Sequence, residues 1–304
     1  MRIAITGATG LVGRRLCHSL ASKGHDLRVL TRNPQRATGL PTQDLRRWSP
    51  LEAPEEGLLS EVDAVVHLAG ESVQGRWTAS KKRSIRESRV RGTASVVDAI
   101  KSARASGTGP SVLVSASAIG WYGERGDDEL NEREPAGSDF LAEVCQAWEA
   151  EAAKAVLHGV RVARLRFGLV LAPEGGALAE MKLPFSLGLG GTLGPGTQWW
   201  SWVHIEDLIA LTTCALDDEA YSGPVNVTAP APVRQREFAK ALGGALSRPA
   251  FLPAPRFALK LALGEFSTEL LTSKRVLPAA AQAAGYEFSF PELSPALTDL
   301  LKTS

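Results

Sequence analysis

Three glycines near the start of the chain have the spacing of a phosphate-binding turn. Gly7, Gly10 and Gly13 follow a short apolar segment, Arg2–Thr6, and precede apolar residues at helical spacing. Gly7 permits a tight turn, Gly10 lets backbone approach a pyrophosphate, and Gly13 lets the helix pack closely on the strand. The helix start adds free N–H groups and a partial positive charge. The residues expected to bind a dinucleotide here are Gly7, Ala8, Thr9, Gly10, Leu11, Val12 and Gly13; a glycine-rich turn without a ligand is the alternative.

The end of the second expected strand favours one of the two nicotinamide dinucleotides. In NAD-binding folds an acidic residue usually stands there and accepts the ribose hydroxyls. This chain instead reads Thr31-Arg32-Asn33-Pro34, with Arg36 close by. Because a guanidinium group fits a 2′-phosphate better than a hydroxyl, Thr31 and Arg32 indicate NADP(H) rather than NAD(H). The alternative is that Arg32 is a solvated residue with no ligand.

A third strand end has the small residues that a bound nucleotide requires. The segment Val65-Val66-His67-Leu68-Ala69-Gly70 is a buried strand followed by Ala-Gly. The backbone of Leu68, Ala69 and Gly70 therefore leaves room for an adenine ribose or a pyrophosphate. His67 lies inside the apolar run and is interpreted as a core residue with satisfied hydrogen bonds rather than as a catalyst.

Strand and helix patterns alternate through the first two-thirds of the chain, which predicts a parallel sheet with helices on both faces. The expected strands are Arg2–Thr6, Asp26–Thr31, Ala64–Leu68, Ser111–Ser115, Val160–Phe167 and Val225–Thr228. The expected helices are residues 11–23, 82–105, 139–157 and 206–217. We therefore predict an α/β fold, a Rossmann-like doubly wound parallel sheet, with a smaller and mostly helical substrate lobe.

The pattern changes near residue 170 and sets the expected domain boundaries. Residues 172–202 are rich in glycine and tryptophan, and residues 230–304 are helical with interrupting prolines. We assign residues 1–170 plus 203–229 to the NADP-binding domain. Residues 171–202 plus 230–304 form the expected substrate lobe, which is interleaved with the last strands.

Composition narrows the class of protein. The chain has 304 residues, of which 44% are hydrophobic and 22% charged, and a formal net charge of +1. The hydrophobic and charged fractions are typical of a globular protein. The net charge of +1 argues against nucleic-acid or membrane-surface partners. Its three cysteines are far apart, which favours a reducing compartment over a disulfide framework or a metal site. Because a core strand is expected from residue 2 and no apolar run nears the length of a membrane span, a cytoplasmic location is expected.

Together these motifs resemble the extended and atypical short-chain dehydrogenases/reductases, the group that includes the sugar-nucleotide epimerases. The motifs that carry this resemblance are Gly7-x-x-Gly10-x-x-Gly13, His67-Leu68-Ala69-Gly70, Ser115-Ala116-Ser117 and Val203-His204-Ile205-x-Asp207. Further stretches resemble an atypical epimerase-family subgroup with a C-terminal domain of unknown function, namely Arg86–Arg89, Phe140–Cys145, Trp148–Glu151 and Gly194–Trp202. This closer likeness covers nearly the whole chain.

The resemblance implies a catalytic tetrad of Asn, Ser, Tyr and Lys, in which Tyr is the general acid/base. The chain has three tyrosines, and none of them has a lysine four residues later: Tyr122, Tyr221 and Tyr286. Leu141 stands at the family's Tyr position and Cys145 at its Lys position. Arg89 stands at the Asn position. Only the serine is kept, as Ser117 or Ser115, and we favour Ser117 for catalysis. The family also implies cofactor contacts by Ser115 and by Phe167, Gly168 and Leu169 at the nicotinamide carboxamide.

The candidate catalytic residues are therefore Ser117, Tyr122, Arg89 and Cys145. Tyr122 follows the serine strand and is a candidate acid, unless it packs the loop. Arg89 is a candidate to hold a substrate carboxylate, or else to pair with Glu143 or Glu149. Cys145 is a candidate thiolate beside Arg89, or an inert small hydrophobic residue.

Three further features bear on the substrate side. Trp199, Trp200 and Trp202 either line an apolar or ring-stacking pocket or pack the lobe. Gly175-Gly176 is a candidate hinge for a flap. His204 and Asp207 are expected to be structural.

Two functions remain open at this stage. One is an NADP(H)-dependent oxidoreductase or epimerase-like enzyme with an unusual proton relay and a small-molecule substrate. The other is a cofactor-binding regulator without catalysis. The resemblance also implies a homodimer through helices 82–105 and 139–157, although their apolar stripes suit packing on the sheet alone.

Overall fold

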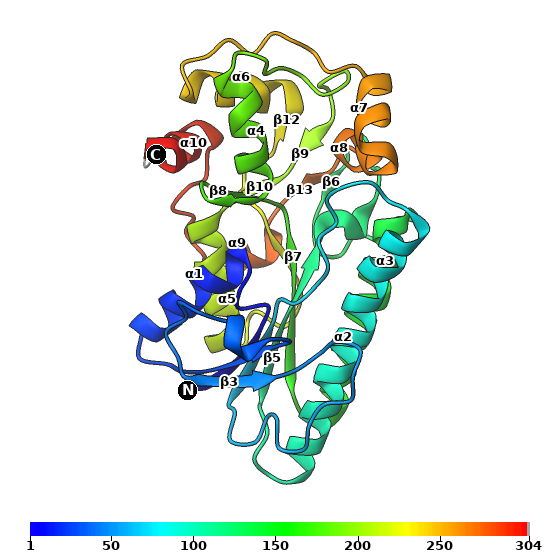
Figure 1. The fold of residues 1–304 in the computed structure, drawn as a ribbon. Coiled ribbons are helices and arrows are strands. Elements are labelled where there is room, and N and C mark those ends of the chain that lie inside the picture. Colours follow the sequence, from blue (N-terminus) through cyan, green and yellow to red (C-terminus); the bar gives the residue numbers. More distant parts are fainter. Residues whose placement is uncertain (303–304) are drawn as a thin grey trace.

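A parallel sheet of seven strands forms the centre of the molecule, in the order β11-β7-β5-β4-β1-β2-β3 (Figure 1). The computed structural model describes residues 1–302. The strands are β1 (Arg2–Thr6), β2 (Asp26–Thr31), β3 (Asp44–Arg47), β4 (Ala64–His67), β5 (Val112–Ala118), β7 (Arg161–Phe167) and β11 (Gly223–Val227). Every neighbouring pair runs parallel. The carboxyl ends of all seven strands therefore meet at one edge, where ligands of such sheets bind.

Helices cover both faces of this sheet, as the sequence predicts for a Rossmann-like fold. They are α1 (Leu11–Ser22), α2 (Ala79–Ala105), α3 (Phe140–Ala153) and α5 (Ile205–Asp217). Alternate residues of each strand point to opposite faces. Ile3 and Ile5 join one core with α1 and α5, whereas Ala4 joins a second core with α2 and α3.

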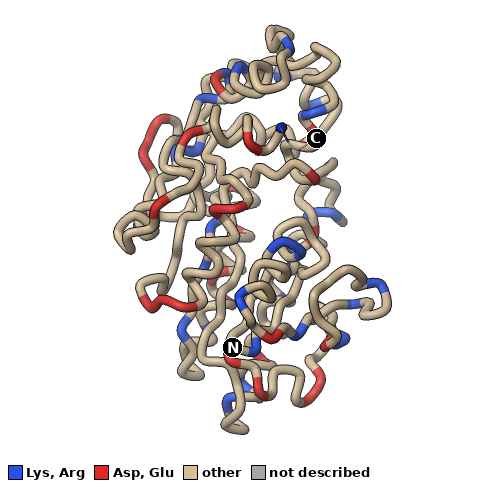
Figure 2. The backbone as a smooth tube through the Cα atoms, turned by 90° about the vertical axis from the view of Figure 1, so that its left-hand side faces the viewer, with Lys and Arg blue, Asp and Glu red and all other residues tan. Residues whose placement is uncertain are grey.

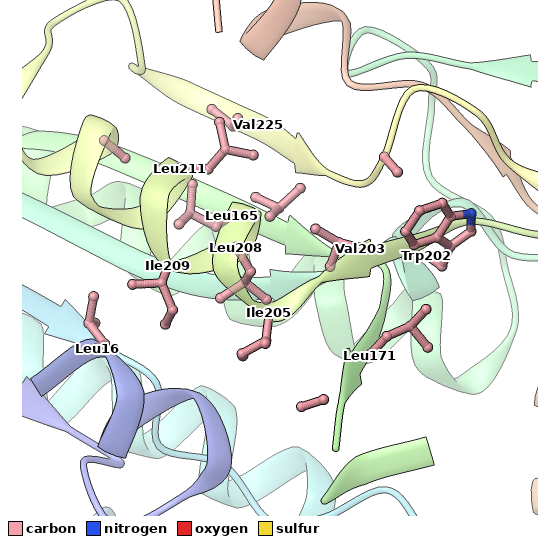
Figure 3. Close-up of a cluster of buried hydrophobic side chains, with 14 of the residues drawn as sticks. Leu16, Leu165, Leu171, Trp202, Val203, Ile205, Leu208, Ile209, Leu211 and Val225 are labelled. Atoms are coloured by element: carbon pink, nitrogen blue, oxygen red, sulfur yellow. The ribbon is translucent and has the colours of Figure 1, made fainter. Parts of the chain in front are cut away.

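The larger core lies between the sheet and α5, and Figure 3 shows Leu165, Leu208, Ile209 and Val225 within it. All four side chains are 4% exposed or less. Complete burial of one such side chain stabilises a fold by about 1.5–3 kcal/mol. This packing fixes α5 on the sheet and makes the strand ends a rigid platform.

A smaller lobe stands above the carboxyl edge of the sheet in the view of Figure 1. Its helices are α4 (Gly176–Ser186), α6 (Gln235–Ala245), α7 (Arg256–Leu263), α8 (Ser267–Leu271) and α10 (Leu293–Lys302). The short helix α9 (Ala279–Ala283) packs against β11 of the sheet. Short strand pairs join distant segments: β8 (Leu169–Ala172) with β10 (Trp202–His204), β9 (Trp199–Trp200) with β12 (Val233–Arg234), and β6 (Glu129–Leu130) with β13 (Arg275–Val276).

The C-terminal segment is tied to the sheet domain through the first turn of α5. The Asp207 carboxylate accepts hydrogen bonds from the Tyr286 hydroxyl at 2.9 Å and from the N–H groups of Ser289 at 2.9 Å and Phe290 at 3.0 Å. His204 stacks on Phe290, with ring centroids 3.7 Å apart. These contacts support the structural roles expected for His204 and Asp207.

Charge is distributed evenly along the chain. In Figure 2, basic and acidic segments are interspersed over the face that is turned to the viewer. Within residues 1–302, no helix combines the length and the hydropathy needed to cross a bilayer. The longest helix, α2, has 27 residues, but Lys, Arg, Glu and Asp side chains interrupt it throughout.

Candidate functional site

The glycine turn between β1 and α1 has the geometry that its spacing predicts. Gly7 has a φ of +71°, a conformation that side chains other than glycine rarely adopt. A Cβ atom on Gly13 would lie 2.2 Å from the Gly7 carbonyl oxygen, so only glycine allows α1 to start this close to β1. Gly10 precedes α1 without a side-chain cap, and no acidic residue occupies the first turn. The N–H groups at the helix start are thus available to an anion.

A cleft of about 360 Å³ opens beside this turn, and we call it the glycine-loop cleft. It is formed by the segments that follow β1, β2, β3 and β4, together with Ser88 of α2. Its lining residues are Gly7, Ala8, Thr9, Gly10, Leu30, Thr31, Arg32, Asn33, Arg36, Trp48, Pro50, Leu68, Ala69, Gly70, Glu71 and Ser88. The structure thereby brings the predicted glycine turn, Thr31-Arg32 and Leu68–Gly70 together in one place. Leu11, Val12 and Gly13 lie in the first turn of α1, behind the cleft.

The glycine-loop cleft carries an excess of positive charge on its β2 side. Arg32 and Arg36 are exposed and line the cleft. Within residues 1–302, neither guanidinium group makes an ion pair or a side-chain hydrogen bond. The one acidic side chain of the lining, Glu71, is paired with Lys81 at 2.6 Å. Two unpaired cations next to a helix N-terminus form a site for a phosphate group.

The loop after β4 is held by a residue that the sequence reasoning missed. The Thr6 hydroxyl oxygen accepts hydrogen bonds from Leu68 N at 3.1 Å and Ala69 N at 3.2 Å. It also lies 2.7 Å from His67 Nδ1, and His67 Nε2 lies 3.1 Å from Thr93 Oγ1. Burial lowers the pKa of His67 to about 4, so the ring is neutral at pH 7. This environment agrees with the interpretation of His67 as a satisfied core residue.

Ser117 is part of a buried ionic network at the carboxyl end of β5. Its hydroxyl donates to Glu149 Oε1 at 2.8 Å. Arg166 donates to both oxygens of the same carboxylate, from Nε at 2.8 Å and from Nη2 at 3.0 Å. Each of the three residues is 2% exposed. Bidentate pairing of this kind fixes the carboxylate and thereby orients the Ser117 hydroxyl.

Tyr122 belongs to the same network, and its side chain is fully buried. Its hydroxyl lies 2.7 Å from Asn226 Oδ1 and accepts a hydrogen bond from Arg166 Nη1 at 3.0 Å. Burial, the largest cause, raises the pKa of Tyr122 to about 12. The structure thus places the candidate acid inside the protein, with its hydroxyl already occupied, and favours the loop-packing alternative.

Arg89 follows Ser88 on α2 and lies beside Gly70, two residues that line the glycine-loop cleft. Its guanidinium donates to the backbone oxygens of Glu71 at 2.8 Å and Ile85 at 3.2 Å, and it lies over the Trp148 ring at 5.1 Å. Burial lowers the pKa of Arg89. The alternative, an ion pair with Glu143 or Glu149, is not formed within residues 1–302, and the Glu149 carboxylate pairs with Arg164 and Arg166 instead. A Cβ atom on Gly70 would lie 3.3 Å from Arg89 Cζ, so Gly70 leaves room for this cation.

Cys145 is not the thiolate that its place beside a cation suggested. It is 3% exposed, and its thiol points to the Ala118 carbonyl oxygen at 3.7 Å. Burial and then Glu149 raise the pKa of the thiol to about 12, although Arg89 lowers it. The burial cost outweighs the nearby positive charge, so Cys145 is a neutral thiol at pH 7.

The groups that the family implied as cofactor contacts, at the ends of β5 and β7, are already hydrogen-bonded within the protein. Ser115 is 1% exposed, and its hydroxyl donates to Ala116 O at 3.3 Å. The N–H of Gly168 donates to Val227 O at 3.0 Å, and that of Leu169 donates to Ser201 O at 2.9 Å. These two N–H groups are therefore unavailable to a carboxamide.

The tryptophan run does not form a common pocket. Trp202 is fully buried, and Trp200 packs edge-on against Phe238 in the lobe core. Trp199 is half-buried between the guanidinium groups of Arg234 at 4.2 Å and Arg275 at 4.7 Å. Packing in the hydrophobic core, the alternative to a substrate pocket, accounts for Trp200 and Trp202. Trp199 instead contacts charged side chains at the surface of the lobe.

Comparison with known proteins places these features in a wider context. Residues 3–227 match the model of the NAD dependent epimerase/dehydratase family, and residues 254–300 match a domain of unknown function. A chloroplastic epimerase family protein SDR39U1 homolog of Arabidopsis thaliana is 43% identical, over 99% of this chain and 87% of its own length.

Two solved structures are also similar to this chain. The human epimerase family protein SDR39U1, solved with NADPH, has a TM-score of 0.89 and 32% identity over the whole of both chains. A nucleoside-diphosphate sugar epimerase of Corynebacterium glutamicum has a TM-score of 0.81 and 36% identity, over 99% of this chain and 58% of that one.

Proposed function

This chain belongs to the NAD-dependent epimerase/dehydratase family, and we propose that it is an NADP(H)-dependent oxidoreductase or epimerase-like enzyme. Its substrate is a small carbonyl or sugar-nucleotide-like molecule. The observation that carries the proposal is the glycine-loop cleft, in which Arg32 and Arg36 stand unpaired beside a helix N-terminus. The NADPH in the structure of the human relative and the sugar nucleotide in the name of the bacterial relative support it.

Each part of the glycine-loop cleft receives one part of the cofactor in this proposal. The N–H groups at Gly10 and the first turn of α1 hold the pyrophosphate. Arg32 binds the 2′-phosphate through its guanidinium fork, and Leu68–Gly70 borders the adenosine ribose. The nicotinamide, when bound, supplies or accepts a hydride. Because no carboxylate pairs with Arg89 within residues 1–302, we assign Arg89 to an anionic group of the cofactor or substrate.

Ser117 remains the candidate partner of the reacting substrate oxygen. Its own proton is donated to Glu149, so its oxygen is free to accept a hydrogen bond from a substrate hydroxyl. Arg166 and Glu149 are assigned to positioning this serine. Tyr122 is assigned to the structural network rather than to proton transfer, since Asn226 and Arg166 occupy its hydroxyl.

A panel of carbonyl compounds and nucleoside-diphosphate sugars tests the enzymatic part of the proposal. Net reduction is followed by the loss of NADPH absorbance. Epimerisation regenerates the cofactor, so its products are followed by NMR. Turnover of any member that disappears in the Arg89→Met variant supports the proposal. No turnover across the panel, with NADPH shown to be bound, contradicts it.

A cofactor-binding regulator without catalysis is the second candidate. The observation in its favour is that Leu141 and the neutral thiol of Cys145 replace the family's Tyr and Lys. A regulator requires a protein partner whose capture changes between NADP+ and NADPH. If Arg32→Ala abolishes that change in capture, the sensing function is supported. An Arg32→Ala protein whose capture still differs between NADP+ and NADPH as much as that of the native protein excludes it.

We also propose an assembly and a location for this protein. A homodimer through the outer surfaces of α2 and α3 is the proposed assembly, and sedimentation at micromolar concentration tests it. The three cysteines are free. Free thiols are typical of reducing compartments such as the cytoplasm, which is the proposed location.

A further inference from the structure

The smaller lobe carries large apolar side chains that the fold leaves in contact with solvent. Within residues 1–302, every large apolar side chain that is at least 60% exposed, apart from Leu157, lies in residues 183–189 or 251–261. Single exposed apolar residues are ordinary on a protein surface, but a group of them marks an interaction site. We call this group the lobe-end patch, and it consists of Leu183, Leu187, Leu189, Phe251, Phe257 and Leu261.

Two segments that are distant in the sequence form the lobe-end patch. Hydrogen bonds hold them side by side: the N–H of Leu252 donates to Gly190 O at 3.1 Å, and Arg248 Nε donates to Ser186 O at 2.9 Å. In Figure 1, the segment that leads into α7 crosses the end of the lobe that lies farthest from the sheet. The patch therefore begins where the two segments meet and continues along α7.

Helix α7 turns apolar side chains away from the protein. Phe257 and Leu261 are four residues apart, so they share one face of the helix, and each is 75% exposed. The helix packs on the lobe through Leu259, which is 8% exposed. A helix of a globular protein normally directs its apolar stripe to the core. Because α7 has apolar side chains on its outer face as well, that face is suited to a second apolar surface.

The segments that form the lobe-end patch contain basic residues and no acidic ones. No aspartate or glutamate lies within residues 181–191 or 248–261. The acidic residues nearest in the sequence are Glu180 and Glu265, and Glu265 is paired with Lys82. The two segments therefore have a local charge of +4, although the whole chain has +1. Their four cations are Lys182, Arg248, Arg256 and Lys260.

This charge decides which partner fits the lobe-end patch. In the part of the chain that the structure describes, none of the four cations makes an ion pair. A second copy in a two-fold dimer would bring the same cations together, and they would repel. A bilayer with anionic lipids offers an apolar interior and negative headgroups, and it needs no matched shape. The net charge of the whole chain, which argued against a membrane partner, does not reveal this local excess of positive charge.

We propose that the lobe-end patch docks this protein on the surface of a membrane that contains anionic phospholipids. The Leu and Phe side chains enter the boundary between headgroups and acyl chains, and the four cations lie among the lipid phosphates. None of the residues that line the glycine-loop cleft belongs to the patch, so docking and cofactor binding use different residues. The proposal does not depend on which reaction the protein catalyses.

Co-sedimentation of the purified protein with lipid vesicles tests the proposal. One set of vesicles contains phosphatidylcholine and phosphatidylglycerol in equal parts, and the other contains phosphatidylcholine alone. The native protein is expected to bind the anionic vesicles at least about tenfold more tightly, because each cation near the surface is attracted by the lipid charge. Added salt is expected to reduce this preference, since it screens the exposed charges.

Two double variants test the two segments separately. One combines Phe257→Gln with Leu261→Gln on α7, and the other combines Leu189→Gln with Phe251→Gln. Each is expected to lower binding to the anionic vesicles at least about tenfold, because apolar area no longer enters the lipid. The melting temperature and the NADPH affinity are expected to stay unchanged, since all four side chains are exposed.

The matched control combines Val156→Gln with Leu157→Gln, an exposed apolar pair outside the patch, and should bind the vesicles as the native protein does. No binding of native protein to the anionic vesicles, equal binding to both sets, or native-like binding by either double variant overturns the proposal. A dimer that the α7 variant converts to a monomer, without vesicle binding, would assign the patch to a second copy. Binding to an acidic amphipathic peptide but to no vesicle would assign it to a protein partner, and both of these results also overturn the proposal.

Discussion

Arg166 is the residue on which the buried polar groups near Ser117 depend. It pairs with Glu149 through two hydrogen bonds, donates to the Tyr122 hydroxyl, and lies 3.9 Å above the Trp121 ring. A buried carboxylate without its cation is strongly destabilising. At the scale of single residues, the network therefore contributes to the stability of the fold and also fixes the position of Ser117.

We expect Arg166→Met to lower the free energy of unfolding by about 3 kcal/mol, because the buried Glu149 carboxylate then keeps only the longer ion pair with Arg164, at 3.6 Å. Urea denaturation at neutral pH measures this change. Lys154→Met, which breaks an exposed pair with Glu151, should cost less than about 1 kcal/mol. Equal losses from the two variants would mean that the Arg166 pair is not desolvated.

The burial of His67 makes the free energy of unfolding depend on pH. The pKa of His67 is about 4 in the folded protein and about 6.5 in an unfolded chain. Between these values the unfolded chain binds the proton and the folded protein does not, so stability falls as the pH falls. From pH 7 to about pH 4.5 the loss is about 2–3 kcal/mol. Urea denaturation across this range should show that slope, reduced in His67→Gln and kept in the control His18→Gln.

At the scale of elements, the sequence predicted those whose pattern is strong. The strands β1 and β2 begin and end where the apolar runs do, and α1 follows the glycine turn as expected. The edge strand β3, which reads Asp-Leu-Arg-Arg, has no such pattern and was missed. It forms because its backbone pairs with β2, which local sequence does not encode.

Substitution of Gly13 tests whether NADPH binding needs the close packing of α1 against β1. Gly13→Ala places a Cβ atom 2.2 Å from the Gly7 carbonyl oxygen, so the helix must move away from the strand. We expect NADPH affinity to fall at least tenfold (~1.4 kcal/mol) and the melting temperature to drop. Gly244→Ala is the control, because a Cβ atom there meets nothing within 4 Å and α6 gains helix propensity. If Gly13→Ala binds NADPH as well as Gly244→Ala does, the close packing is not required.

The candidate site was only partly predictable for a physical reason. Glycine spacing and the absence of an acidic residue after β2 are local signals, and they identified the glycine-loop cleft. Whether Cys145 ionises, or what Glu149 pairs with, depends on burial and on partners from distant strands.

At the scale of the whole molecule, Asp207 joins the C-terminal segment to the sheet domain. Three hydrogen bonds to its carboxylate hold residues 286–290. We expect Asp207→Ala to lower the free energy of unfolding by about 3 kcal/mol and to speed hydrogen exchange in residues 286–302. Glu206→Ala, which removes a surface partner of Arg15, is the control. Unchanged hydrogen exchange in this segment would show that apolar contacts hold it on the sheet domain without the Asp207 hydrogen bonds.

Binding of NADPH, NADP+ and NADH to the purified protein, followed by tryptophan fluorescence, tests the central claim most directly. The account predicts that NADPH binds more tightly than NADH. It also predicts that Arg32→Ala weakens NADPH binding at least tenfold (~1.4 kcal/mol, the scale of one charged contact), while the exposed control Arg133→Ala leaves it unchanged. Equal affinity of native protein and Arg32→Ala, or no binding of any nucleotide, would contradict it.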